Sequence, residues 1–159
     1  MSDPAGISAW LRIDERITTS GQPTEPQLTM LRALGVAHVV NLALHSHPKA
    51  LRDERASVEA LGMEYIHIPV EFDNPTEADF ATFHRVMEAR RHGRVHIHCI
   101  VNARVSAFMY KYRRDGGHVG VREARAAMET IWRPGGVWAA LIGDQTRIDS
   151  AHEWVSVTP

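Results

Sequence analysis

The sequence predicts an α/β fold in which a central, mostly parallel sheet is flanked by helices. Two observations carry this prediction: short apolar runs of strand length recur along the chain, and segments with apolar residues at helical spacing lie between them. Such alternation is typical of a parallel sheet covered by helices. No repeat and no linker rich in proline, glycine or serine divides the 159 residues, so we expect a single domain over residues 1–159.

The first half of the chain is expected to contribute four strands and two helices. The strands are Trp10–Ile13, Ile17–Ser20, Val36–Ala43 and Tyr65–Val70. The first helix begins at Thr24, which has the spacing of a capping box with Gln27, and Gly35 ends it. A second helix is expected around Leu51–Leu61, with Gly62 as its stop.

The second half continues the alternation. Thr76 and Asp79 have capping-box spacing and open a helix, which is followed by a strand at Arg94–Cys99. A long amphipathic helix comes next, and after the Gly116-Gly117 break there is another. A last helix is expected near Val137–Ile142, and the pattern assigns no structure to the remainder of the tail.

Composition and charge exclude several classes of protein. The chain carries 18 Lys and Arg against 19 Asp and Glu, and 44% of its residues are hydrophobic, which argues against disorder and against nucleic-acid binding by a basic surface. No apolar run is long enough for a membrane span, and the first residues lack the pattern of a secretion signal. With a single cysteine, no intramolecular disulfide can form. We therefore expect a cytoplasmic protein.

The segment Arg94–Ser106 concentrates the chemistry. A buried strand is expected to run into a short loop, and a helix begins at the far end of that loop. This geometry directs backbone N–H groups and the positive end of a helix dipole at one point above the loop. Cys99 at the strand end is placed to act as a thiolate nucleophile, and Arg104 can pair two oxygens of an oxyanion. These groups together suit attack on a phosphate ester.

The same segment resembles a known family. His98-Cys99, Arg104 and Ser106 are similar to the active-site loop of cysteine-dependent protein tyrosine and dual-specificity phosphatases, whose signature is His-Cys, five residues, Arg, then Ser or Thr. Thr19-Ser20-Gly21-Gln22-Pro23 and Ile68-Pro69-Val70 with Asp73 occur in the order of that fold. The Ser-Gly-Gln-Pro segment, together with the run from Asn102 to Phe108, resembles most closely a bacterial branch sometimes fused to metallo-β-lactamase-type hydrolases.

The resemblance implies a dual-specificity-phosphatase-like fold and a set of roles. Cys99 would form a phosphocysteine intermediate, and Asp73 would protonate the leaving group, with Asp79 as the alternative acid. His98 would orient the loop from beneath, and Ser106 would support the thiolate. Ser20 and Gln22 would border the pocket. The phosphate oxygens would be held by the Arg104 side chain and by the backbone N–H groups of the loop, namely those of Ile100, Val101, Asn102, Ala103, Arg104 and Val105.

The loop departs from the signature because four residues, not five, separate Cys99 from Arg104. Either the loop is one residue short, or its length is kept and the arginine stands one position early. We prefer the second interpretation, because Ser106 then keeps the place of the signature Ser or Thr. Asn102 then falls where these phosphatases usually have a glycine of positive φ, which asparagine also tolerates.

The sequence therefore predicts a phosphoric monoester hydrolase with a cysteine nucleophile. Two alternatives remain: a non-catalytic module that binds phosphate or another oxyanion, and a rhodanese-like sulfurtransferase. The expected partner is a phosphorylated protein or small molecule, or inorganic phosphate, with no nucleic acid and no membrane. No cofactor is expected, and no metal, because the pairs His45/His47 and His96/His98 lack a third ligand at a recognisable spacing. The oligomeric state leaves no signal in the sequence.

Overall fold

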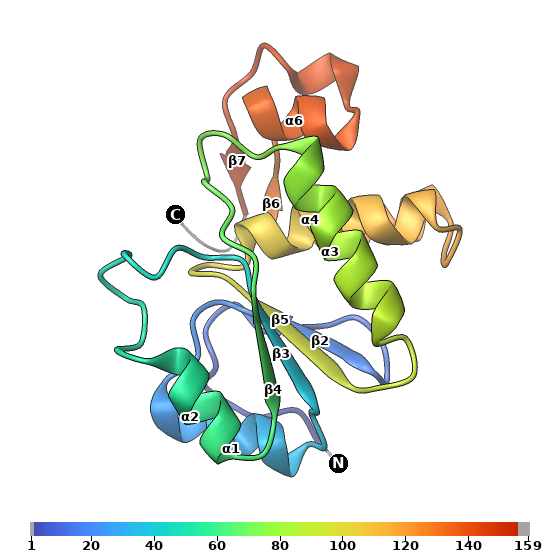
Figure 1. Ribbon diagram of the computed structural model, residues 1–159. Helices are drawn as coiled ribbons and strands as arrows, with labels where there is room; N and C mark the ends of the chain where they lie inside the picture. The colour runs from blue at the N-terminus through green and yellow to red at the C-terminus, as the bar shows by residue number, and fades with distance from the viewer. Residues whose placement is uncertain (1, 156–159) are drawn as a thin grey trace.

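A five-stranded sheet lies at the centre of the computed structural model, which describes residues 2–155 (Figure 1). The strand order is β1-β2-β5-β3-β4. The strands β2, β5, β3 and β4 pair in parallel, and β1 joins the edge in the antiparallel direction. The sheet is thus mostly parallel, as predicted, and its strands are β1 (Leu11–Arg12), β2 (Ile17–Ser20), β3 (His38–Asn41), β4 (Glu64–His67) and β5 (Val95–His98).

Helices cover both faces of the sheet (Figure 1). One face carries α1 (Glu25–Ala33) and α2 (Glu54–Ala60), whose buried residues Leu28, Leu31 and Val58 pack with Val39 in a smaller core. The other face carries the larger core, beneath α3 (Glu77–Ala89), α4 (Ala103–Asp115), α5 (Val121–Glu129) and α6 (Gly136–Ile142). The central strand β5 is therefore buried on both sides, which accounts for its continuous run of buried residues.

Local signals in the sequence fix the helix starts. Thr24 caps α1 and Thr76 caps α3, and in both cases the side chain three residues later accepts a hydrogen bond from the cap's backbone N–H, as a capping box requires. Asp53 caps α2 by accepting a hydrogen bond from the Ala56 N–H. Both predicted capping boxes are confirmed.

The predicted strand at Tyr65–Val70 is too long at its C-terminal end. The pairing of β4 with β3 ends at His67. Beyond it, Ile68 and Val70 each donate one backbone hydrogen bond, the first to the last residue of β3 and the second to the residue after it. Pro69 has no N–H to donate, so a regular ladder cannot continue through it. The strand predicted at Val36–Ala43 is likewise reduced to His38–Asn41.

The tail, to which the sequence pattern gave only one helix, folds against the larger core. β6 (Trp132–Arg133) and β7 (Glu153–Trp154) form a small antiparallel pair, with α6 and a 3₁₀ turn, η1 (Gln145–Arg147), between them. Trp132 and Trp154 stack with ring centroids 4.8 Å apart, and both lie against Phe72. Within the described residues, none of the helices has the length and apolar character needed to cross a bilayer.

Candidate active site

Cys99 follows β5 directly, at the carboxyl end of the parallel sheet. β5 lies between β2 and β3 and runs parallel to both. The loop after β5 therefore lies beyond the carboxyl ends of the strands, where such sheets bind their ligands. Asn102 ends the loop with φ +68° and is the N-cap of α4. This left-handed conformation is the one expected at that position, and the Asn102 side chain stabilises it by donating hydrogen bonds to the Ala9 carbonyl and the Thr19 hydroxyl.

The loop after Cys99 carries a run of unpaired backbone donors. Within residues 2–155, none of the six successive backbone N–H groups from Ile100 to Val105 donates a hydrogen bond, and the first to do so in α4 belongs to Ser106. A cavity of about 170 Å³, here called the inner cavity, is lined by Cys99, Ile100, Val101, Ala103, Arg104, His47 and Phe72. Free N–H groups at a helix start suit an anionic ligand, so the inner cavity beside the buried thiol of Cys99 is a candidate anion site.

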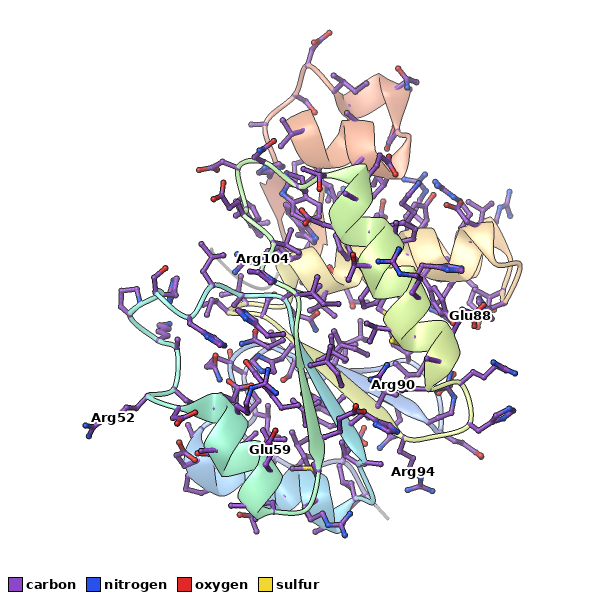
Figure 2. All side chains as sticks on the ribbon, viewed as in Figure 1. Arg52, Glu59, Glu88, Arg90, Arg94 and Arg104 are labelled. Carbon is purple, nitrogen blue, oxygen red and sulfur yellow. The ribbon has the colours of Figure 1, made fainter. Side chains whose placement is uncertain are left out.

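Arg104 lies at the second position of α4 and reaches the same cavity. It is largely buried, its Nη1 donates to the Val70 carbonyl at 3.1 Å, and its Nε has no hydrogen-bond partner. Figure 2 shows Arg104 near the centre of the molecule, beside the loop that follows β4, while Arg52 points away from the protein. Val105, which stands at the usual arginine place in the preferred alignment, is buried in the larger core. The guanidinium that faces the cavity therefore belongs to Arg104.

The Ser-Gly-Gln-Pro segment supports the loop from below. The Gln22 N–H donates to the Ile100 carbonyl at 3.1 Å, and Gly21 lies so close that a Cβ there would stand 2.5 Å from the same oxygen. The Ser20 hydroxyl is hydrogen-bonded to the His96 ring. Neither Ser20 nor Gln22 lines the inner cavity, so their position beneath the loop differs from the expected one at the border of the pocket.

His98 is buried under the loop and joins it to a residue that the sequence pattern did not single out. One ring nitrogen contacts the Cys99 carbonyl at 3.1 Å, and the other lies 2.6 Å from the Glu54 carboxylate at the start of α2. The Gln22 amide donates to the second oxygen of Glu54 at 2.9 Å. Burial by itself raises the pKa of Glu54, but His98, by its charge and hydrogen bond, and Gln22 outweigh it and hold the pKa below its ordinary value.

The histidine pairs have structural partners. His96 is fully buried, its two ring nitrogens bond to the hydroxyls of Thr18 and Ser20, and burial lowers its pKa well below the ordinary range. The His45 ring stacks on His67 at 3.7 Å. Nowhere in residues 2–155 do three or more His, Cys, Asp or Glu side chains gather in a way that could hold a metal ion.

The two acid candidates lie in different settings. Asp73 is exposed and lines a wider cavity of about 330 Å³, the outer cavity, which shares His47, Phe72 and Arg104 with the inner one. Asp79 is the return partner in the capping box of α3 and lines neither cavity. Of the two carboxyl groups, only that of Asp73 therefore belongs to a residue that shares a cavity wall with Arg104.

The segment that carries Asp73 is held by the tail. The Trp138 indole N–H donates to the Phe72 carbonyl at 2.7 Å, and the Phe72 ring packs against the rings of Trp132, Trp138, His152 and Trp154. The tail residues 132–154 thus help to fix one wall of both cavities.

Ser106 lies in the first turn of α4, and its hydroxyl donates to the Ala103 carbonyl at 3.1 Å. In this arrangement its proton is directed at the backbone and not at Cys99.

Comparison with known proteins agrees with this geometry. No family model matches the sequence. The curated beta-lactamase hydrolase-like protein of Agrobacterium fabrum is 34% identical over 92 residues, which cover 56% of this chain and 21% of that protein. The chain therefore matches about a fifth of the length of this relative. A solved structure from Shewanella putrefaciens CN-32, described as "Putative phosphatase (DUF442)", superposes with a TM-score of 0.78 and 31% identity, covering 87% of this chain and 91% of that one.

The chain belongs to the DUF442 family, within the cysteine-dependent tyrosine and dual-specificity phosphatase superfamily. The predicted fold and resemblance are confirmed. P. aeruginosa TpbA, solved in complex with phosphotyrosine, shares the fold of this DUF442 domain at 22% identity, with a TM-score of 0.62 over 76% of this chain and 72% of that one.

Two parts of the site in this DUF442 domain were not predicted from sequence. Glu54 has no motif of its own, and the only local signal is its place directly after the N-cap Asp53. Trp138 lies in the first turn of α6, and its contact with Phe72 spans 66 positions of sequence. Both contacts arise from packing, which local patterns do not encode.

Proposed function

We propose that this DUF442 domain hydrolyses phosphoric monoesters through a phosphocysteine intermediate on Cys99. The observation that carries the proposal is the run of six unpaired N–H groups from Ile100 to Val105, in a loop whose residues line the inner cavity together with Cys99 and Arg104. A dianionic phosphoryl group in that cavity would receive hydrogen bonds from the backbone and from the guanidinium at once. The proposal takes residues 1–159 as one functional domain.

The reaction proceeds in two displacements. The Cys99 thiolate attacks phosphorus, an S–P bond forms, and the P–O bond to the leaving group breaks while Asp73 gives its proton to the departing oxygen. Water then attacks the phosphocysteine and gives a proton to Asp73, so that inorganic phosphate leaves and the thiolate is regenerated. In both steps charge gathers on the three equatorial oxygens, where the loop N–H groups and Arg104 stabilise it.

The size and lining of the outer cavity indicate the class of substrate. The outer cavity, at about 330 Å³, falls within the roughly 300–1000 Å³ of small-molecule sites. Its wall combines the Phe72 and His47 rings with the Glu71 and Asp73 carboxyl groups. It can therefore take the remainder of a phosphorylated side chain or of a small phosphorylated metabolite.

A sulfurtransferase is the second candidate, favoured by one observation. The spacing of four residues between Cys99 and Arg104 is shorter than that of the phosphatase signature and occurs in some rhodanese-type loops. In that reaction the Cys99 thiolate would attack the outer sulfur of thiosulfate, so that sulfite leaves and a persulfide forms, and cyanide or a thiol would then take that sulfur and regenerate the thiolate.

The deciding experiment compares the hydrolysis of p-nitrophenyl phosphate by the wild type, Cys99→Ser and Arg104→Lys between mildly acidic and neutral pH. We expect Cys99→Ser to abolish turnover. Arg104→Lys keeps the positive charge but removes the planar guanidinium, which can donate two parallel hydrogen bonds to phosphate oxygens. This change should lower kcat about a hundredfold. Arg52→Lys is the matched control, because Arg52 points away from the protein (Figure 2), and should leave turnover unchanged.

Three other outcomes would redirect the assignment. Equal turnover by Cys99→Ser and the wild type would exclude the cysteine mechanism. Thiosulfate:cyanide transfer without phosphatase activity would identify the sulfurtransferase. Binding of inorganic phosphate without either turnover would identify an oxyanion-binding module.

A further inference from the structure

The buried contacts of His98 determine its charge. Its Nδ1 lies 3.1 Å from the Cys99 carbonyl, and its Nε2 lies 2.6 Å from the Glu54 carboxylate. A carbonyl oxygen can only accept a hydrogen bond, and so can an ionised carboxylate. Each ring nitrogen must therefore carry a proton, which makes the ring a cationic imidazolium whenever Glu54 is ionised.

Glu54 is held in the ionised state by its other contact. The Gln22 amide donates to Oε1 at 2.9 Å while His98 occupies Oε2, so both carboxylate oxygens accept hydrogen bonds. The side chains of Glu54 and His98 are 2% and 0% exposed, so the pair is shielded from solvent and each charge depends on the other. The lowered pKa of Glu54 has the same cause.

We propose that Glu54 is a positioning residue that holds His98 as an imidazolium directly beneath the Cys99 loop and thereby stabilises the thiolate of the nucleophile. The positive ring is bonded to the nucleophile's own residue, and the negative carboxylate lies on the far side of the ring. The pair thus presents its positive ring, and not its carboxylate, to the residue that carries the thiol. The proposal rests on the proposed role of Cys99 but is tested without any phosphoester.

Loss of the carboxylate would change the charge of the ring. In Glu54→Gln the side chain keeps its size, but a buried His98 without a counter-ion would lose its proton, because burial disfavours an unpaired charge. The thiolate would then lose a nearby positive charge. The other titratable groups around the pair are His45 after β3, Tyr65 and His67 on β4, and His96 on β5.

The test uses the fact that Cys99 is the only cysteine in the chain. The ultraviolet absorbance of its thiolate is followed against pH in the wild type and in Glu54→Gln, each corrected with the same protein carrying Cys99→Ala. We expect the midpoint to rise by about one pH unit in Glu54→Gln, which corresponds to a tenfold lower thiolate fraction below the midpoint. Asp53→Asn is the matched control, because it removes an adjacent carboxylate that caps α2 without touching His98, and its midpoint should not move.

An unchanged or lowered midpoint in folded Glu54→Gln would overturn the proposal. A second measurement covers the case in which that variant does not fold. Nitrogen NMR of histidine side chains in the wild type should show both ring nitrogens of His98 protonated at neutral pH, with His98→Asn used to assign the signal. A neutral ring with a single N–H would overturn the proposal. Because neither readout involves turnover, a failure of the phosphatase assay is distinguishable from a failure here.

Discussion

Gly21→Ala tests whether the Ser-Gly-Gln-Pro segment positions the anion-binding loop. A Cβ at Gly21 would lie 2.5 Å from the Ile100 carbonyl oxygen and 3.3 Å from the carbonyl carbon. Side-chain carbons almost never approach closer than 3.0 Å, so the two backbones must separate by about 0.5 Å or more. The Ile100 carbonyl also accepts the Gln22 N–H, so this separation stretches that hydrogen bond and displaces the first N–H groups of the loop.

The substitution should lower both the free energy of unfolding, through overpacking, and the rate of catalysis, through displacement of the loop N–H groups. Overpacking costs about 1–3 kcal/mol of unfolding free energy, and here the shortest contact is with backbone, which cannot rotate away. A displacement of about 1 Å in a catalytic array lowers rates about a hundredfold, so the half-ångström shift here should lower kcat/KM by about tenfold. Urea unfolding measures the first effect. Calorimetric binding of inorganic phosphate and hydrolysis of p-nitrophenyl phosphate measure the second.

Gly120→Ala is the matched control for the same substitution. Gly120 has φ −66°, and a methyl group added there would have no heavy atom within 4 Å, so only its N-cap preference changes. We expect this control to bind phosphate like the wild type. If Gly21→Ala is as stable as Gly120→Ala and binds phosphate equally well, the close approach of Gly21 to Ile100 does not position the loop, and the reasoning is refuted.

Three further predictions concern the walls and base of the site. Trp138→Phe removes the hydrogen bond to the Phe72 carbonyl. It should lower the free energy of unfolding, measured in urea, by about 1 kcal/mol, and it should lower kcat several-fold. Wild-type values for both quantities would show that the tail does not fix the Asp73 segment. Asn102→Ala should lower the free energy of unfolding by about 1–2 kcal/mol more than Asn102→Gly does, because alanine is disfavoured at φ +68°. Equal urea midpoints for the two variants would contradict this. The pKa of buried Glu54 lies below its ordinary value of 4.5, so its contribution to stability is present above about pH 4.5 and is lost as the pH falls through the folded-state pKa. Urea unfolding at a series of pH values should therefore show a shallower acid loss in Glu54→Gln than in the wild type, and parallel curves would refute the assignment.

The sequence alone was sufficient for the order of the five strands of the central sheet and of the helices that cover it. Strand and helix patterns are local, because the alternation of apolar residues and the caps at Thr24 and Thr76 depend on neighbours within a few positions. The same locality located the strand–loop–helix segment at Cys99 and the positive φ at Asn102. The exact strand ends were not predictable in this way, since Tyr65–Val70 is apolar beyond the point where the ladder with β3 stops.

The roles of several site residues depended on contacts between distant segments. Glu54 meets His98 across 44 positions, and Trp138 meets Phe72 across 66. Ser20 and Gln22 were recognised as a motif, but only the packing of β2 against β5 places them beneath the loop and not at its rim.

The sequence by itself determined the fold class, the superfamily and the segment that carries the proposed nucleophile, because each depends on patterns of residues that are near neighbours along the chain. The tertiary structure decided that Arg104 faces the cavity from its early position, which carboxylate pairs with His98 and what holds the Asp73 segment. The physical reason is that burial and hydrogen bonding between remote side chains depend on how the sheet and its two helical layers pack. That packing places the local pattern at Cys99 in the wall of a cavity, where we propose that an anion binds.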